Sequence, residues 1–255
     1  MRTDIRIIRG KEQSTGVWAG GTTTQLAIWP PDADYAMRNF RWRMSSARVD
    51  LEESTFTALP GIRRLIMILE GRVRLVHEGR HEINLDAFDQ DAFDGGWNTL
   101  SQGRCVDFNL MMAAGCEGSL RALKMDEKGD EAEKKPAARV CEVALFTSFA
   151  PEGAAEAFYC LAPRVKVLVY EGEKADGEKV AHGRKADEET AFEAELERGD
   201  FILLLQNRPV AAVMFLQEVR EGPSARAFGV HASVRWQRGP GSLSSDGSPL
   251  RFGPV

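Results

Sequence analysis

The chain has 255 residues, of which 43% are hydrophobic and 28% charged, and its formal net charge is −5. This length supports one large domain or two small ones with a full hydrophobic core, and a mildly acidic chain lacks the positive field that nucleic-acid binding requires. No apolar run reaches the roughly 18 residues of a membrane span, and the first residues lack the apolar segment of a secretory signal. We therefore expect a globular, cytoplasmic protein with no nucleic-acid or membrane partner.

A period of two dominates the first half of the sequence. Residues 40–49 alternate bulky apolar residues with polar or small ones, and residues 64–69 form a short apolar run. Residues 72–77 and 81–85 flank a Glu-Gly-Arg turn, which predicts a β-hairpin, and residues 105–112 predict a further strand. Short strands with frequent glycine-bearing turns favour a sandwich or barrel over alternating β-α units.

The second half shows a similar pattern after an interruption. Residues 121–139 are dense in charge and carry Pro136, which is typical of a linker. The Glu-Gly that follows an apolar strand at residues 68–71 has a counterpart at 169–172, which favours two similar halves. Strand-like segments resume at 140–146, 157–161, 165–170, 201–205 and 210–216. The predicted division is an N-terminal barrel with the pocket at 1–120, the linker at 121–139, a degenerate C-terminal barrel at 140–238 and a Gly-, Ser- and Pro-rich tail at 239–255.

Polar residues occupy strand positions where a core favours apolar ones. Within residues 40–49, Phe40, Trp42 and Met44 share one face, and the opposite face carries an arginine beside small residues. Small residues beside an arginine leave the space that the wall of a ligand cavity needs. Asp107 and Asn109 share one face of the strand predicted at 105–112, and Arg64 begins the apolar strand at 64–69. If these residues line the same barrel lumen as Arg43 and Ser45, the five side chains form a polar patch in an apolar tube.

A buried arginine in such a lumen requires an anionic partner. Asp107 can fill that role permanently, or an anionic ligand can do so through the two-pronged guanidinium group. An Arg–Asp pair that closes the mouth of the barrel, or an Arg43 that faces water, is the structural alternative, and alternation alone does not decide between them.

Metal ligands are sparse. No C-x-x-C pair is present, so the cysteines are expected to be free thiols packed as small apolar groups. His77 and His81 flank a hairpin turn, but Glu78 and Glu82 alternate out of phase with them and no third ligand is visible. We therefore predict no metal and no cofactor. The acidic residues Asp86, Asp89, Asp91 and Asp94 are interpreted as a solvated loop.

Six ordered segments cover most of residues 17–112. They are Trp18-Ala-Gly-Gly-Thr-Thr, Phe40-Arg-Trp-Arg-Met-Ser-Ser-Ala-Arg-Val, Phe56-Thr-Ala-Leu-Pro-Gly-Ile-Arg-Arg-Leu, Leu69-Glu-Gly, Phe93-Asp-Gly-Gly-Trp and Asp107-Phe-Asn-Leu-Met. Together they resemble the HutD/Ves family, a group of bicupin proteins linked to bacterial histidine utilisation. The resemblance implies an all-β bicupin of two jelly-roll barrels with few short helices, and a lumen pocket in the N-terminal half.

Two positions depart from the family pattern. Arg63 and Gly96 stand where the family usually has acidic residues, so negative charge is expected to be missing near the pocket. Metal-holding cupins carry a His-x-His pair, which this chain lacks. The resemblance therefore implies a metal-free cavity that binds a ligand.

The predicted function is a metal-free bicupin that binds a small carboxylate and modulates amino-acid catabolism, with histidine-degradation intermediates as the ligand class. Arg43 and Arg64 are expected to hold the carboxylate. Ser45 and Asn109 would bond its polar groups, and Asp107 would orient an arginine. Apolar contacts are assigned to Trp42 and Met111.

Two alternatives stay open at this point. A metal-independent isomerase or hydrolase of a small organic acid would use Asp107 as its general base. An interaction scaffold would fill the lumen with side chains and bind a partner through its second barrel. A homodimer is compatible with each of them.

Overall fold

The computed structural model describes residues 3–123, 140–146, 153–172, 190–206, 211–218 and 227–237. Among these residues the one helix is a short 3-10 turn at Gly10–Glu12, and no helix there has the length and apolarity to cross a bilayer. The predicted all-β class is confirmed. The strands are β1 (Asp4–Ile8), β2 (Ser14–Trp18), β3 (Gly21–Trp29), β4 (Trp42–Val49), β5 (Glu53–Thr55), β6 (Arg63–Gly71), β7 (Val73–His77), β8 (Glu82–Leu85), β9 (Gln90–Asp94), β10 (Thr99–Gln102), β11 (Cys105–Met112), β12 (Cys116–Leu123), β13 (Val140–Leu145), β14 (Gly153–Cys160), β15 (Arg164–Gly172), β16 (Thr190–Glu197), β17 (Phe201–Gln206), β18 (Ala211–Glu218) and β19 (Gly229–Trp236).

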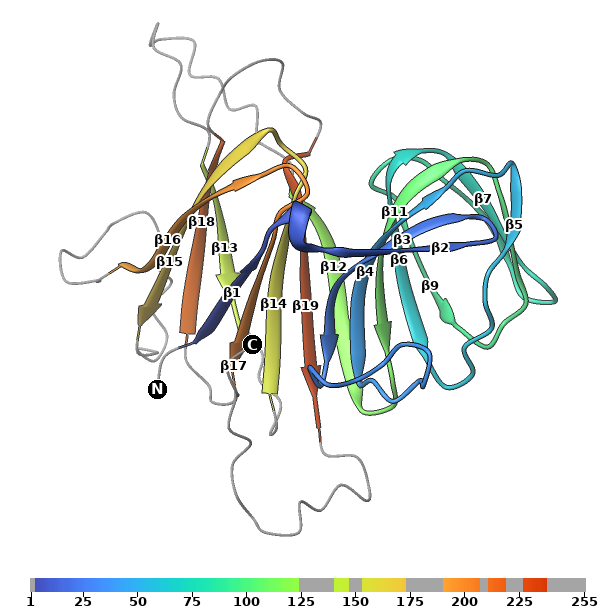
Figure 1. The fold of residues 1–255 in the computed structure, drawn as a ribbon, viewed down its shortest axis with the longest axis horizontal. Helices are drawn as coiled ribbons and strands as arrows, with labels where there is room; N and C mark the ends of the chain where they lie inside the picture. Colours follow the sequence, from blue (N-terminus) through green and yellow to red (C-terminus); the bar gives the residue numbers. More distant parts are fainter. Residues whose placement is uncertain are drawn as a thin grey trace, which may run out of the picture.

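Strands β2 to β11 build an N-terminal lobe of two sheets (Figure 1). The six-stranded sheet has the order β2-β3-β4-β11-β6-β9, and the four-stranded sheet has the order β5-β10-β7-β8. Ile66 and Ile68 of the larger sheet pack with Leu75 and Leu85 of the smaller one, so the two sheets enclose a common interior. The predicted hairpin is the β7–β8 pair.

The remaining strands build a C-terminal lobe, again of two sheets. A five-stranded sheet has the order β1-β17-β14-β19-β12, and a four-stranded sheet has the order β13-β18-β15-β16. A second apolar cluster lies between them and includes Phe158, Val167, Ile202 and Met214. Short alternating strands therefore produce two layered lobes rather than one continuous sheet.

Two strands that begin within the predicted N-terminal range of 1–120 belong to the C-terminal lobe. β1 lies in the N-terminal range but pairs with β17, and β12 pairs with β19 along its whole length (Figure 1). The segment expected to be a linker at 121–139 begins inside β12, which continues to Leu123. The rest of that segment and the tail at 239–255 lie outside the described residues, so the division into four parts stays a prediction.

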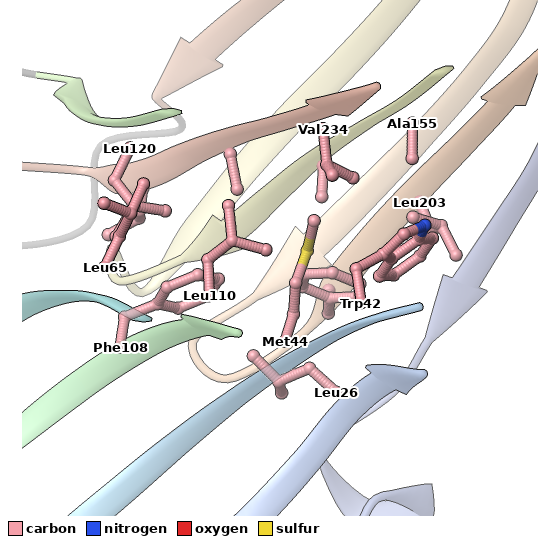
Figure 2. Packing of buried hydrophobic residues seen from close by; sticks show 14 of the residues in the cluster. Leu26, Trp42, Met44, Leu65, Phe108, Leu110, Leu120, Ala155, Leu203 and Val234 are labelled. Carbon is pink, nitrogen blue, oxygen red and sulfur yellow. The ribbon is translucent and has the colours of Figure 1, made fainter. Parts of the chain in front are cut away.

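The outer face of the six-stranded sheet packs against the five-stranded sheet of the other lobe. Figure 2 shows Trp42 and Met44 of β4 pointing toward the strands that carry Leu203 and Val234. The Trp42 ring lies 5.9 Å from that of Trp236, measured between centroids. Because successive side chains of a strand alternate, this contact directs the intervening residues of β4 into the N-terminal lobe.

All four cysteines fall within the described residues and are free thiols. Cys105 and Cys160 are buried, and burial raises the pKa of each thiol to about 12. Both are therefore protonated at neutral pH and pack as small apolar groups.

Candidate ligand-binding site

A cavity of about 380 Å³ opens inside the N-terminal lobe. Its floor is the inner face of β3, β4, β6 and β11, and its rim includes β2, where Val17 is 86% exposed. Six of the seven predicted site residues line it, namely Arg43, Ser45, Arg64, Asp107, Asn109 and Met111. A lumen filled with side chains, as the scaffold alternative required, is contradicted by this hollow.

Strand register explains why these residues converge. β11 pairs with β4 so that Asn109 lies opposite Ser45 and Met111 lies opposite Arg43. On its other side β11 pairs with β6, which places Met111 opposite Arg64. The pleat turns all these side chains to the same face, because the residues between them are held in the core between the lobes.

Arg43 is 5% exposed and is held in place by neutral groups. Its Nε donates to Gln25 Oε1 at 2.9 Å and its Nη1 donates to Ser45 Oγ at 3.1 Å. The guanidinium carbon lies 4.3 Å from the centroid of the Tyr35 ring, a cation–π contact. Burial lowers the pKa of Arg43. Among the described residues no carboxylate forms an ion pair with it, so its charge has no anionic partner there.

Arg64 is 6% exposed, and its guanidinium lies against two aromatic rings. Its guanidinium carbon lies 4.7 Å from the ring centroid of Phe56 and 5.2 Å from that of Phe93. Its Nη2 donates to Asn109 Oδ1 at 2.8 Å, whereas its buried Nε has no hydrogen-bond partner among the described residues. Burial lowers the pKa of Arg64 to about 10, and the nearby Asp107 opposes this change. Arg64 is therefore charged at neutral pH.

Asp107 is the acidic group of the cavity and is 2% exposed. The side-chain amide of Asn109 donates to its Oδ1. Burial raises the pKa of Asp107 to about 7, although Arg64, Asn109 and the backbone at Ala47 favour the ionised form. At neutral pH this carboxyl compensates only part of the charge of the two arginines, which leaves the cavity positive.

Trp42 does not line the cavity, and its predicted role as a ligand contact is corrected. It is fully buried between the lobes, where its ring stacks on Trp29 at 6.3 Å between centroids. The alternation that turns Arg43 inward turns Trp42 outward. Arg63 and Gly96, expected to alter the charge near the pocket, are likewise exposed and outside the cavity lining.

Among the cavity residues that the sequence did not predict, Gln25, Tyr35 and Phe56 contact the two arginines. Gln25 lies opposite Ser45 in the β3–β4 pairing, so alternation would have found it once that pairing was known. Tyr35 and Phe56 lie outside the strands and reach the cavity from connecting segments. Irregular segments have no periodicity from which a side-chain direction can be inferred.

A second polar cluster lies at the end of β7. His77 is buried rather than exposed at a hairpin tip, and its Nε2 lies 2.8 Å from Asp91 Oδ2. His81 Nε2 lies 3.3 Å from the same oxygen. The expectation that no third ligand accompanies the two histidines is therefore wrong, because β9 supplies Asp91. The side chain of Asp91 is 10% exposed, so it is also wrong to count it in a solvated loop.

These features define an all-β, cupin-like protein whose N-terminal lobe holds a buried, arginine-lined cavity. The family model described as HutD matches residues 11–180, and the chain belongs to the HutD family. A protein of 21.2 kDa from the hutC 3′ region of Pseudomonas putida, described as uncharacterized, is 31% identical over 118 residues. That match covers 44% of this chain and 60% of the relative's length.

Solved structures share the fold. HutD from Pseudomonas fluorescens SBW25, determined in a formate condition, has a TM-score of 0.61 and 18% identity, and the match covers 92% of this chain and all of that one. A conserved protein of unknown function from Pseudomonas aeruginosa PAO1 has a TM-score of 0.63 and 19% identity, with 91% and 99% of the two chains covered. Both likenesses extend over the N- and C-terminal lobes together.

Proposed function

We propose that this protein binds a small carboxylate in the N-terminal cavity and, through that binding, modulates amino-acid catabolism in the cytoplasm, with histidine degradation as its pathway. Each lobe is, in this proposal, a cupin barrel, and only the first one keeps a ligand pocket. The observation that carries the proposal is the presence of two buried arginines in one cavity without an ion-paired carboxylate among the described residues.

The charge balance supports an anionic ligand. Burying a charge without a partner is costly, and the hydrogen bonds of Arg43 and Arg64 go to neutral atoms. Each guanidinium keeps N–H groups that these bonds do not use, including the buried Nε of Arg64. A carboxylate can accept two parallel bonds from such a fork, which supplies both charge and geometry.

The walls define the rest of the ligand. About 380 Å³ lies near the small end of pockets that hold small molecules, roughly 300–1,000 Å³. Met111, Phe56 and Tyr35 offer apolar and aromatic surface, whereas Ser45 and Gln25 offer hydrogen-bonding groups. A short acid with a flat or narrow body and a second polar group suits this combination.

The comparisons favour histidine degradation as the source of the ligand. The chain belongs to the HutD family, and its relative in Pseudomonas putida lies beside hutC. Urocanate, formiminoglutamate and formylglutamate, the intermediates of this route, are all carboxylates. Formate, the condition in which the Pseudomonas fluorescens HutD structure was determined, is the smallest member of that chemical class.

One observation favours a second candidate function, a metal-independent isomerase or hydrolase. Asp107 has a pKa raised to about 7 and lies in the cavity wall, which is the condition that a general base needs at neutral pH. Conversion of a histidine-pathway acid by the purified protein, lost in Asp107→Asn, would establish this activity. If the protein binds the acid but does not convert it, the protein is a binding protein and not an enzyme for that acid.

The test is a thermal-shift screen of these acids, followed by calorimetric titration of those that raise Tm. Arg64→Ala removes the inner guanidinium, and Arg63→Ala is its matched control because the neighbouring Arg63 is exposed. We expect one acid to bind at one site per chain, with binding lost in Arg64→Ala and kept in Arg63→Ala. Absence of a shift with every carboxylate, or equal binding by Arg64→Ala, would overturn the proposal.

A further inference from the structure

His77, His81 and Asp91 place three metal-ligating atoms around one point of the N-terminal lobe. The three atoms lie within 4.8 Å of one another, and the described residues hold no second group of this kind. His77 ends β7, His81 follows the turn into β8, and Asp91 lies on β9 of the other sheet. The cluster therefore joins the two sheets of the lobe.

Its donor set matches a particular kind of cation. Two imidazoles and one carboxylate suit Zn²⁺ and neighbouring divalent transition ions, whereas Mg²⁺ and Ca²⁺ prefer oxygen ligands alone. Ligand atoms around a tetrahedral zinc ion lie about 3.3 Å apart when the bonds are about 2.0–2.1 Å. The distances from Asp91 Oδ2 to the two Nε2 atoms, 2.8 and 3.3 Å, are already close to that spacing.

The surroundings resemble the outer shell of a metal site. His77 Nδ1 lies 2.8 Å from Thr99 Oγ1, so the nitrogen that faces away from Asp91 is fixed by an oxygen, as it is in most metal-bound histidines. Thr99 Oγ1 also lies 3.5 Å from the carbonyl oxygen of Trp97. Thr99 can therefore donate to that carbonyl and accept from Nδ1–H, which is the tautomer that leaves the lone pair of His77 Nε2 for a metal ion.

Access to the cluster is separate from the arginine cavity. The side chain of His81 is 42% exposed and that of His77 is 0% exposed, so an ion can enter from the surface and be held from the interior. The ring of Phe93 lies between the two regions, 4.6 Å from the His77 ring and 5.2 Å from the Arg64 guanidinium carbon. Neither histidine lines the cavity.

We propose that His77, His81 and Asp91 form a binding site for one Zn²⁺ ion, with water in the remaining position on the side where His81 is exposed. The ion replaces the Nε2 protons that the histidines otherwise donate to Asp91, and it ties β9 to the β7–β8 hairpin. The zinc site lies outside the carboxylate cavity, and carboxylate binding is measured separately on metal-free protein.

The test uses the full chain after treatment with a chelator, titrated with ZnCl₂ by calorimetry, and with CoCl₂ by the visible absorption of four-coordinate Co²⁺. We expect one ion per chain and a rise of Tm with zinc. His81→Ala and Asp91→Asn should abolish both signals, and Thr99→Val should weaken zinc binding roughly 10–100-fold through loss of the outer-shell bond.

Glu82→Gln and Cys141→Ser are the matched controls, because they remove an exposed carboxylate beside His81 and a thiol elsewhere. Both should bind zinc as the unaltered chain does. His81 is partly exposed, so its variant is expected to fold and the test stays decisive. Absence of stoichiometric zinc binding, or unchanged binding in His81→Ala and Asp91→Asn, would show that the cluster is a hydrogen-bonded triad without a metal.

Discussion

Arg64 is joined to Asp107 through the side chain of Asn109. The amide oxygen of Asn109 accepts a bond from Arg64 Nη2, and its nitrogen donates to Asp107 Oδ1. This arrangement keeps the carboxylate near the guanidinium but leaves the Nε of Arg64 without a hydrogen-bond partner among the described residues. Because Asp107 neutralises only part of the charge of Arg64, the guanidinium can form an ion pair with the carboxylate of a bound ligand.

The geometry of the Arg64 fork matters in addition to its charge. Lysine at this position keeps a positive charge but loses the paired N–H groups and the planar stacking on Phe56 and Phe93. We expect Arg64→Lys to bind the ligand roughly 10-fold more weakly, which is about 1.4 kcal/mol, by calorimetric titration. Affinity equal to that of the unaltered chain would show that Arg64 acts only as a point charge.

Carboxylate binding should weaken as the pH rises above 7. Asp107, whose pKa is about 7, repels a bound anion only when it is ionised, so the complex favours the protonated form. We expect the affinity to fall by up to about 10-fold per pH unit above 7, since one proton is taken up on binding. Titration with formate between pH 6 and 8.5 measures this, because formate stays ionised throughout that range.

Asp107→Asn is the matched variant for this pH dependence. It keeps the shape of the side chain and removes its titration, so its affinity should be constant over the same range. A pH profile that is flat in the unaltered chain, or that survives unchanged in Asp107→Asn, would contradict the role given to this carboxyl.

The same group should make the stability of the fold depend on pH. Its pKa is about 7 in the folded chain and about 3.9 in an unfolded one, so the folded chain binds more protons between these values. The free energy of unfolding therefore falls as the pH rises from about 4 to about 7 and is level above that. Between pH 5 and pH 8 the contribution is about 3 kcal/mol.

Chemical denaturation of the unaltered chain and Asp107→Asn at both pH values isolates that contribution. Relative to the unaltered chain, the variant should gain about 3 kcal/mol between pH 5 and pH 8, because other titrating groups cancel in the comparison. If the difference in free energy of unfolding between the two chains does not change with pH, the fold does not raise the pKa of Asp107.

Trp42 should affect stability and leave ligand binding unchanged. It is fully buried among residues of both lobes and has an indole nitrogen without a hydrogen-bond partner among the described residues. We expect Trp42→Ala to lower the free energy of unfolding by about 3–5 kcal/mol. Trp42→Phe, which keeps most of the apolar volume, should retain the ligand affinity of the unaltered chain. Weaker ligand binding by Trp42→Phe would show that Trp42 contacts the ligand, contrary to its position outside the cavity.

The sequence could predict the residues of the cavity that lie on regular strands. A period of two places Arg43 and Ser45 on one face of their strand, and Asp107, Asn109 and Met111 on one face of theirs. That the two faces line one lumen is a hypothesis until the strands are paired. The apolar residues between these side chains are buried in the core between the lobes. Their burial determines that the polar face, and not the apolar one, turns toward the cavity. The same rule places Trp42 on the opposite face, so its assignment to the ligand did not follow from the pattern.

Other features depend on pairing between distant strands, which local patterns do not contain. Asp91 joins His77 only because β9 lies at the edge of the larger sheet beside the smaller one, and nothing in its spacing indicates this. The pairing of β1 with β17 and of β12 with β19 likewise joins segments that are far apart in the sequence. An alternating strand specifies a buried face but not the sheet that covers it.

A crystal structure of the protein with the acid selected by the screen would show directly whether the two arginines hold a carboxylate. We expect one molecule in the N-terminal cavity, with its carboxylate oxygens within hydrogen-bond distance of the guanidinium groups of Arg43 and Arg64. A carboxylate bound outside the cavity, or a cavity in which both arginines turn away from the bound acid, would contradict it.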